Sequence, residues 1–118
     1  MPWSDAVARE IERGREAERI GNAGMARTCA RRAAGIAIRE LESRLKGKND
    51  SKDLIQELRW VAEERGFPRE VQQAAYRLQQ RLNPDFTSLS KNPLFDAEII
   101  VRFVRDELEK LQAPPPSS

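Results

Sequence analysis

Four arginines stand close together between residues 22 and 39, with no acidic residue among them. They are Arg27, Arg31, Arg32 and Arg39. Arg32 and Arg39 are seven residues apart and Arg27 and Arg31 are four apart, so a helix would carry them on two neighbouring lines. Because the arginine fork matches phosphate oxygens, one interpretation is a contact strip for RNA or a nucleotide. The alternative is that these arginines pair with acids of the first and last predicted helices.

Other residue types that often carry out catalysis are poorly arranged for it. Carboxylates occur in close pairs, namely Glu63 with Glu64, Asp96 with Glu98 and Asp106 with Glu107. Neighbouring residues on a helix point about 100° apart, so adjacent acids do not converge on one ion. The single cysteine, Cys29, falls on an apolar arc, and the chain has no histidine to act as its base. We therefore predict no catalytic residue, no metal ligand and no cofactor, and hence no enzyme.

The arginines belong to a stretch that is typical of one long helix, from about residue 22 to residue 46. Small and apolar residues recur in it three or four positions apart: Ala26, Ala30, Ala33, Ala37, Leu41 and Leu45. Further apolar residues widen this stripe: Met25, Cys29 and Ile36. Because alanine lets neighbouring backbones approach closely, we predict that this is the central helix of a bundle.

Four further helices are predicted around it, over about residues 3–20, 51–65, 68–83 and 92–111. Gly21 suits the left-handed end of the first helix, and Asn22 suits the N-cap of the second. No stretch alternates strictly between polar and apolar residues, as a half-buried strand would. The expected fold is all-α, a single-domain up-and-down bundle of four to five helices over residues 1–112. Residues 113–118, rich in proline and serine, are expected to form a disordered tail.

Composition favours one water-soluble domain. The chain has 118 residues, of which 39% are hydrophobic and 34% charged. Its 21 basic and 19 acidic residues leave a net charge of +2, too small for a general attraction to polyanions. No apolar run reaches the roughly 18–20 residues that span a bilayer. The first residues lack a basic segment followed by an apolar one, so we expect no signal peptide, no membrane partner and a cytoplasmic location.

Several large side chains fall outside the main apolar stripes or widen them. Trp60 and Tyr76 lie off the stripes, and Ile100 and Phe103 add to the heptad-spaced stripe of the last helix. Such a surplus indicates an interface, so the leading hypothesis is a non-catalytic bundle that acts through protein–protein contact, as a homodimer or with a protein partner. The alternative is an RNA- or nucleotide-binding module that uses the four arginines, with Trp60 and Tyr76 stacking on bases.

The first helical hairpin, roughly Ala6 to Leu45, resembles the HEPN superfamily of small helical bundles. The resemblance consists of an alanine-punctuated first helix, the turn Ile20-Gly21-Asn22, and the alanines Ala26, Ala30, Ala33, Ala34 and Ala37 of the long second helix. The amphipathic stretch from Asp96 to Leu111 is also of the kind that closes such bundles. The resemblance implies a bundle that dimerises and works beside a nucleotidyltransferase partner or on RNA. The ribonuclease branch uses an arginine followed five residues later by histidine; without histidine, only a non-catalytic member fits.

Overall fold

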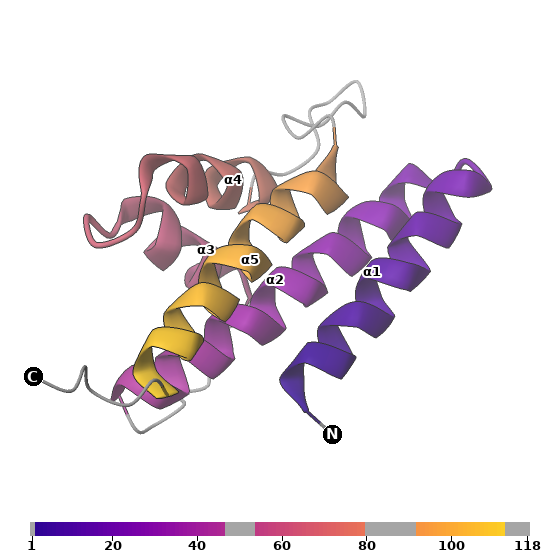
Figure 1. Ribbon diagram of the computed structural model, residues 1–118. Helices are drawn as coiled ribbons and strands as arrows, with labels where there is room; N and C mark the ends of the chain where they lie inside the picture. Colours follow the sequence, from indigo (N-terminus) through magenta and orange to yellow (C-terminus); the bar gives the residue numbers. More distant parts are fainter. Residues whose placement is uncertain (1, 47–53, 80–91, 113–118) are drawn as a thin grey trace, which may run out of the picture.

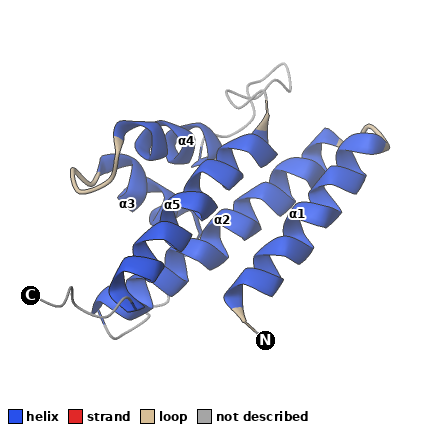
Figure 2. Ribbon diagram, in the orientation of Figure 1, coloured by secondary structure: helices blue, strands red, loops and turns tan. Residues whose placement is uncertain are grey.

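The computed structural model describes residues 2–46, 54–79 and 92–112. Within these ranges the chain forms helices and turns and no strand (Figure 2). The predicted polar turn after residue 47, nearly all of the loop predicted between Pro84 and Asn92, and the Pro/Ser tail lie outside the described residues. The all-α prediction is confirmed for the part of the chain that the structure describes.

Five helices make up these described ranges, in the order predicted. They are α1 (Trp3–Arg19), α2 (Ala23–Lys46), α3 (Leu54–Glu63), α4 (Arg69–Gln79) and α5 (Pro93–Gln112). Helices α1 and α2 form an antiparallel hairpin, and α5 runs along α2 in the same direction (Figure 1). The shorter helices α3 and α4 form a second pair, which lies on the other side of α2 and α5 from α1 (Figure 1).

The ends of the first hairpin follow the capping chemistry that the sequence predicts. Gly21 has a φ of 80°, in the left-handed region that glycine adopts without strain. The backbone N–H of Asn22 then donates to the Ala17 carbonyl oxygen at 2.7 Å. The side-chain oxygen of Asn22 accepts the Met25 backbone N–H at 3.0 Å, which satisfies one donor that the start of α2 would leave free. The turn between α1 and α2 is therefore fixed by local bonds.

Helix α2 is the centre of the bundle, as predicted, because it packs against each of the other four helices. Its small-residue stripe is almost wholly buried: Ala26, Ala30, Ala33, Ala34, Ala37 and Leu41 are at most 2% exposed. The two ends of the stripe depart from the prediction. Met25 is 42% exposed and Leu45 is 56% exposed.

The last helix also departs from the prediction in one residue that matters for function. Ala97, Val101, Val104 and Leu108 are buried as expected, but Ile100 is only 1% exposed. The prediction that Ile100 belongs to an interface is therefore wrong, since its side chain lies in the core of the bundle. A helix with neighbours on two sides buries a wider arc than a single seam, and Ile100 falls on the second side.

A glycine lets α1 approach α2 and α5 closely. A Cβ atom on Gly14 would lie 2.5 Å from Leu94 Cδ2 and 3.2 Å from Cys29 Cβ. Leu94 is buried, with 4% exposure, so its side chain has little room to move away. Gly14 thus marks a point where three helices meet without space for a methyl group.

We expect Gly14→Ala to destabilise the protein by up to about 2 kcal/mol. Overpacking a filled core typically costs about 1–3 kcal/mol, which exceeds the roughly 1 kcal/mol gained when alanine replaces glycine in a helix. Gly24→Ala is the matched control, because its Cβ would meet only Asn22 Oδ1, at 3.8 Å. Urea unfolding should show a loss for the first variant and no loss for the second; equal stabilisation of both would refute the close approach.

Candidate functional site

The four arginines of α2 do not form one exposed strip. Arg39 Nε donates to Oε1 of Glu57 on α3 at 2.8 Å, and Arg31 Nε donates to the Leu78 carbonyl oxygen on α4 at 2.7 Å. Arg27 is 6% exposed, whereas Arg32 lies on the surface. The sequence left open that the arginines pair with acids of the first and last helices. The structure shows other partners for two of them, since Arg31 bonds to α4 and Arg39 to α3.

Arg27 is a buried guanidinium with no ion-pair partner among the described residues. Its Nε and Nη2 atoms are shielded from solvent and have no hydrogen-bond partner among the described residues. Burial lowers the pKa of Arg27, and the pKa of Arg31 is lowered by burial and by the neighbouring charge of Arg27. Arginine nevertheless stays protonated in proteins, so both residues keep their charge. An ion buried without a partner typically costs several kcal/mol.

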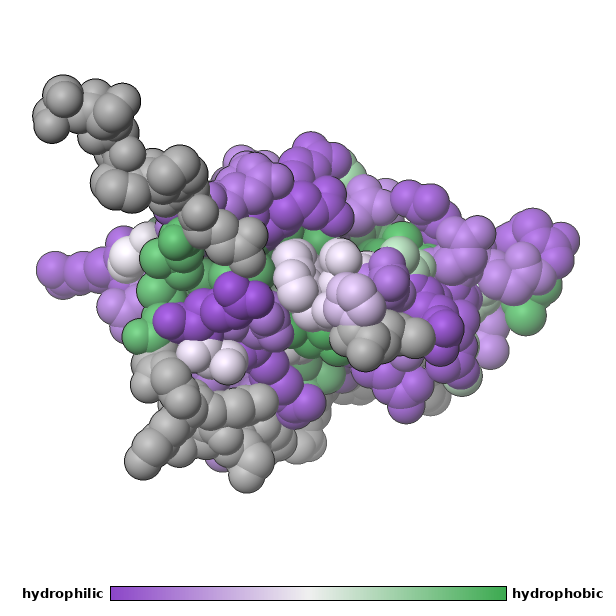
Figure 3. Space-filling model, turned by 60° about the horizontal axis from the view of Figure 1, so that its bottom comes forward, coloured by the Kyte–Doolittle hydropathy of each residue, from purple (hydrophilic) through white to green (hydrophobic). Residues whose placement is uncertain are grey.

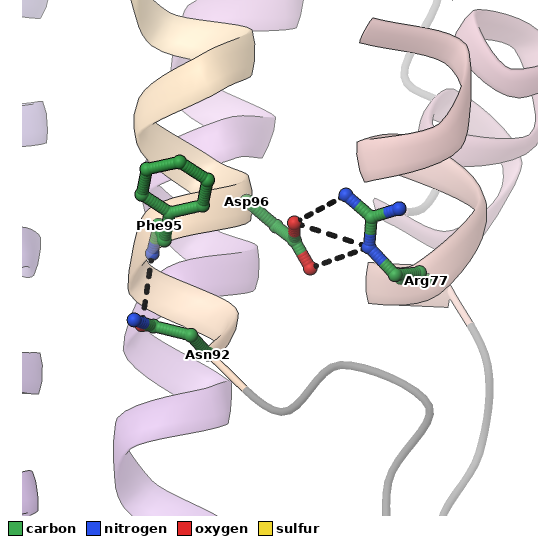
Figure 4. A network of polar contacts seen from close by, with 4 residues as sticks. All are labelled: Arg77, Asn92, Phe95 and Asp96. Carbon is green, nitrogen blue, oxygen red and sulfur yellow. Dashed lines mark hydrogen bonds and ion pairs between the residues drawn. The ribbon is translucent and has the colours of Figure 1, made fainter. Parts of the chain in front are cut away.

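Buried acids are the polar feature that the sequence analysis did not find. Glu57 is 0% exposed, Glu42 2% and Asp96 4%. Asp96 lies in the first turn of α5 and receives a fork of bonds from Arg77 of α4 (Figure 4). Arg77 Nη2 donates to Oδ1 at 2.7 Å, and Arg77 Nε donates to both carboxylate oxygens at 3.1 Å. This pairing raises the pKa of Arg77 and joins α4 to α5.

The start of α5 is held by a second bond beside this pair. Asn92 Oδ1 accepts the Phe95 backbone N–H at 3.2 Å, one residue before Asp96 (Figure 4). The carboxylate of Asp96 also lies at the positive end of the helix dipole. The first turn of α5 is thus fixed both by its own cap and by Arg77.

We expect Asp96→Asn to destabilise the protein by about 2–3 kcal/mol. Breaking a buried ion pair costs about 3–5 kcal/mol, and the smaller figure follows because the Arg77 side chain is 35% exposed and partly solvated. Glu98 lies on the same helix as Asp96 and forms an exposed ion pair with Arg15 of α1. Glu98→Gln removes that pair and should cost less than about 1 kcal/mol. Chemical denaturation of both variants checks this; an Asp96→Asn loss no larger than that of Glu98→Gln would contradict it.

An apolar groove lies between the C-terminal halves of α2 and α5, next to α3. Its volume is about 440 Å³, and its lining residues are Leu41, Leu45, Trp60, Glu64, Gly66, Phe67, Phe103 and Glu107. The rings of Trp60 and Phe67 meet edge to face with centroids 5.1 Å apart, and those of Phe67 and Phe103 lie 5.5 Å apart. Two of the predicted interface residues, Trp60 and Phe103, therefore lie together in one aromatic cluster, half-buried.

Tyr76, the remaining predicted interface residue, is not part of this groove. It lies on α4 with 51% of its surface exposed. Four residues were predicted to form an interface. Two of them line the groove, one lies elsewhere on the surface and one is in the core.

Large exposed aliphatic residues extend the groove at its open end. Leu45 is 56% exposed, and Leu111, one helical turn beyond the groove residue Glu107, is 52% exposed. Figure 3 shows hydrophobic surface, in green, between hydrophilic residues near the end of the molecule where α2 and α5 terminate. The described lining residues that carry charge are two glutamates, Glu64 and Glu107. The groove is therefore apolar along its floor and acidic at its edge.

A second groove, between α1 and α5, has a different chemistry. Its volume is about 410 Å³, and it brings together Arg15, Arg102 and Arg105 with Glu12 and Glu98. Arg15 Nη2 donates to Glu98 Oε1 at 2.9 Å, so part of the positive charge is neutralised within the groove. Mixed charges on exposed side chains favour neither a phosphate nor a cation, and we assign no ligand to this groove.

The described residues hold no group of three or more histidine, cysteine, aspartate or glutamate side chains placed to bind a metal ion. Across the same part of the chain, no helix is both long and apolar enough to cross a membrane. Cys29 is 0% exposed, as its place on the apolar arc predicts. Burial raises the pKa of the Cys29 thiol, and the negative charge of Glu10 adds to the effect. The thiolate that a nucleophile requires is therefore disfavoured.

This raised pKa predicts a stability change at alkaline pH. The folded state keeps the Cys29 proton more tightly than the unfolded chain, so its contribution to stability is complete below the unfolded pKa of roughly 8.5 and declines as pH rises through the folded pKa. Urea midpoints measured from neutral to alkaline pH should therefore fall more for the wild type than for Cys29→Ala. Parallel curves for the two proteins would show that the thiol does not titrate differently on unfolding.

No protein-family model matches the chain, and neither a curated protein nor a solved structure is significantly similar to it. The resemblance to the HEPN superfamily stays a prediction. The helical hairpin of α1 and α2 is compatible with it, but small-residue hairpins occur in many all-α proteins.

Proposed function

We propose that this protein is a non-catalytic interaction module whose aromatic groove binds an amphipathic helix of a partner protein. The observation that carries the proposal is the groove itself, where a half-buried aromatic floor meets two exposed leucines. An exposed apolar surface of this kind is typical of a binding site, because water contact with it is unfavourable. Burying one leucine fully contributes about 1.5–3 kcal/mol, and Leu45 and Leu111 are both available for burial.

The shape of the groove favours a helix as the occupant. The groove runs between two helices, α2 and α5, whose contributing residues recur every four positions: Leu41 and Leu45 on one side, Phe103, Glu107 and Leu111 on the other. A partner helix presents anchors at the same spacing, so its apolar face can follow this channel. The edge-to-face contacts of Trp60 with Phe67 hold the floor in one conformation before binding, which lowers the entropic cost of association.

The charge of the rim favours a basic partner over a second copy of this chain. In a symmetric dimer built on this groove, the same surface of the two copies would be placed together with the acids Glu64 and Glu107 of both, and like charges at an interface are unfavourable. Lys110 Nζ lies 3.1 Å from Glu107 Oε1 and weakens this effect without removing it, because Glu64 is also acidic. A helix with lysine or arginine beside its apolar face complements the rim.

The RNA-binding alternative has less support than the groove. It requires four arginines on one accessible surface, whereas Arg31 and Arg39 bond to α4 and α3 and Arg27 is buried. Trp60, expected in that alternative to stack on bases, packs against Phe67.

A phage-displayed library of helical peptides, panned on the folded protein, tests the proposal. We expect enrichment of peptides with apolar residues at i, i+3 or i+4 and i+7 flanked by lysine or arginine. Leu45→Glu removes an apolar contact and buries a carboxylate against the apolar face of the peptide, which outweighs its attraction to basic flanks, and should weaken selected peptides by at least about tenfold, equivalent to roughly 1.4 kcal/mol. Ile20→Glu is the matched control. Ile20 is 63% exposed and lies in the turn before α2, at the end of the molecule opposite to the groove.

Three results would contradict the proposal. The first is that no such peptide is enriched, and the second is that Leu45→Glu and Ile20→Glu affect binding equally. The third comes from light scattering: a dimer that becomes a monomer in Leu45→Glu, but not in Ile20→Glu, would assign the groove to a second copy of the chain.

A further inference from the structure

We infer that Arg27 and Arg31 form a binding site for a phosphate group at the end of α2 remote from the aromatic groove. The site goes beyond the proposed function, because neither arginine lines the groove. It rests on a buried guanidinium that has no partner among the described residues, beside a second guanidinium that is already oriented.

The geometry brings two donors of one kind together. Arg27 and Arg31 are one turn apart on α2, so their side chains are neighbours on the same side of the helix. Arg31 is held in place by its bond from Nε to the Leu78 carbonyl oxygen at the end of α4. The pair of arginines therefore lies where α2 meets α4.

The unpartnered charge of Arg27 calls for an anion. Both guanidiniums stay protonated, and Arg27 acts on Arg31 as a like charge. The pKa of Arg27 is lowered by burial, whereas that of Arg31 is lowered by burial and by the charge of Arg27. A single negative group between the two side chains would relieve the desolvation of Arg27 and the repulsion together.

A phosphate group fits this requirement better than a carboxylate does. The Nε and Nη2 atoms that lack partners on Arg27 lie on the same edge of the guanidinium, and together they can donate to two oxygens of one tetrahedral anion. A phosphate has further oxygens on its other side for Arg31, whereas a carboxylate offers Arg31 only the remaining lone pairs of the same two oxygens. Because Arg27 is 6% exposed, the group recognised is small, such as inorganic phosphate or the end of a phosphomonoester.

Isothermal titration of the full chain with inorganic phosphate, at constant ionic strength set with chloride, tests this site. We expect Arg27→Met to weaken phosphate binding by at least about tenfold, as the loss of hydrogen bonds to a charged group implies. Arg32→Met is the matched control, because Arg32 is an exposed arginine on the same helix and should leave binding unchanged. Arg27→Lys keeps the charge and loses the fork, so it should bind more weakly than the wild type even if Arg27→Met does not fold.

A second titration distinguishes the sources of phosphate. Stronger binding of AMP than of phosphate, with no binding of adenosine, identifies a phosphomonoester as the ligand, and equal binding of AMP and phosphate identifies the phosphate group alone. Absence of phosphate binding by the wild type would overturn the inference. Equal weakening by Arg27→Met and Arg32→Met would also overturn it, because it would reveal a diffuse attraction to surface charge. Neither result depends on peptide binding in the groove, so this inference and the proposed function fail separately.

Discussion

The close packing of the small-residue face of α2 is the constraint on which the rest of the structure depends. The alanines of this face, from Ala26 to Ala37, are at most 1% exposed, and each of the other four helices contacts α2. Alanine contributes little apolar area per residue, so the facing helices supply the larger buried side chains, such as Leu58, Leu78 and Ile100. The glycines extend the same constraint: Gly14 admits Leu94 of α5, and Gly35 admits Leu54 of α3.

This constraint explains where the large side chains lie. Where helices pack closely against the alanines of α2 there is no room for several rings, and Trp60, Phe67 and Phe103 lie together beside the C-terminal half of α2. There they are half-buried and form the floor of a groove instead of a core. The aromatic cluster and its exposed leucine neighbours are therefore a consequence of the same small-residue packing that holds the bundle together.

Periodicity and capping residues were sufficient to predict the five helices and the central place of α2, because those features depend on local sequence. The same reasoning placed Ile100 at an interface, whereas it is buried in the core. Helix α5 is covered by neighbouring helices on two sides, and the number of neighbours is a property of the whole fold that local sequence does not give. It also missed Glu57, which lies on the buried side of α3 with Leu54, Leu58 and Val61. Its place, three residues after Leu54 and four before Val61, is one where an apolar residue is expected. An acid at such a position was a usable signal; its partner Arg39 was visible only as one of four arginines.

The two proposed surfaces lie at opposite ends of one rigid element. From Arg27 to Leu45 is 18 residues of continuous helix, a separation of about 27 Å at 1.5 Å per residue. A phosphate at Arg27 would act mainly on the contact of α2 with α4, through Arg31 and Leu78, whereas the groove depends on the contacts of α2 with α3 and α5. Helix α4 is joined to α5 by the Arg77–Asp96 fork and also packs against α3, so it contacts both helices that flank the groove beside α2. The buried ion pair is therefore one of two contacts of α4 through which occupancy of the arginine site would reach the groove, and the packing of α4 on α3 is the other.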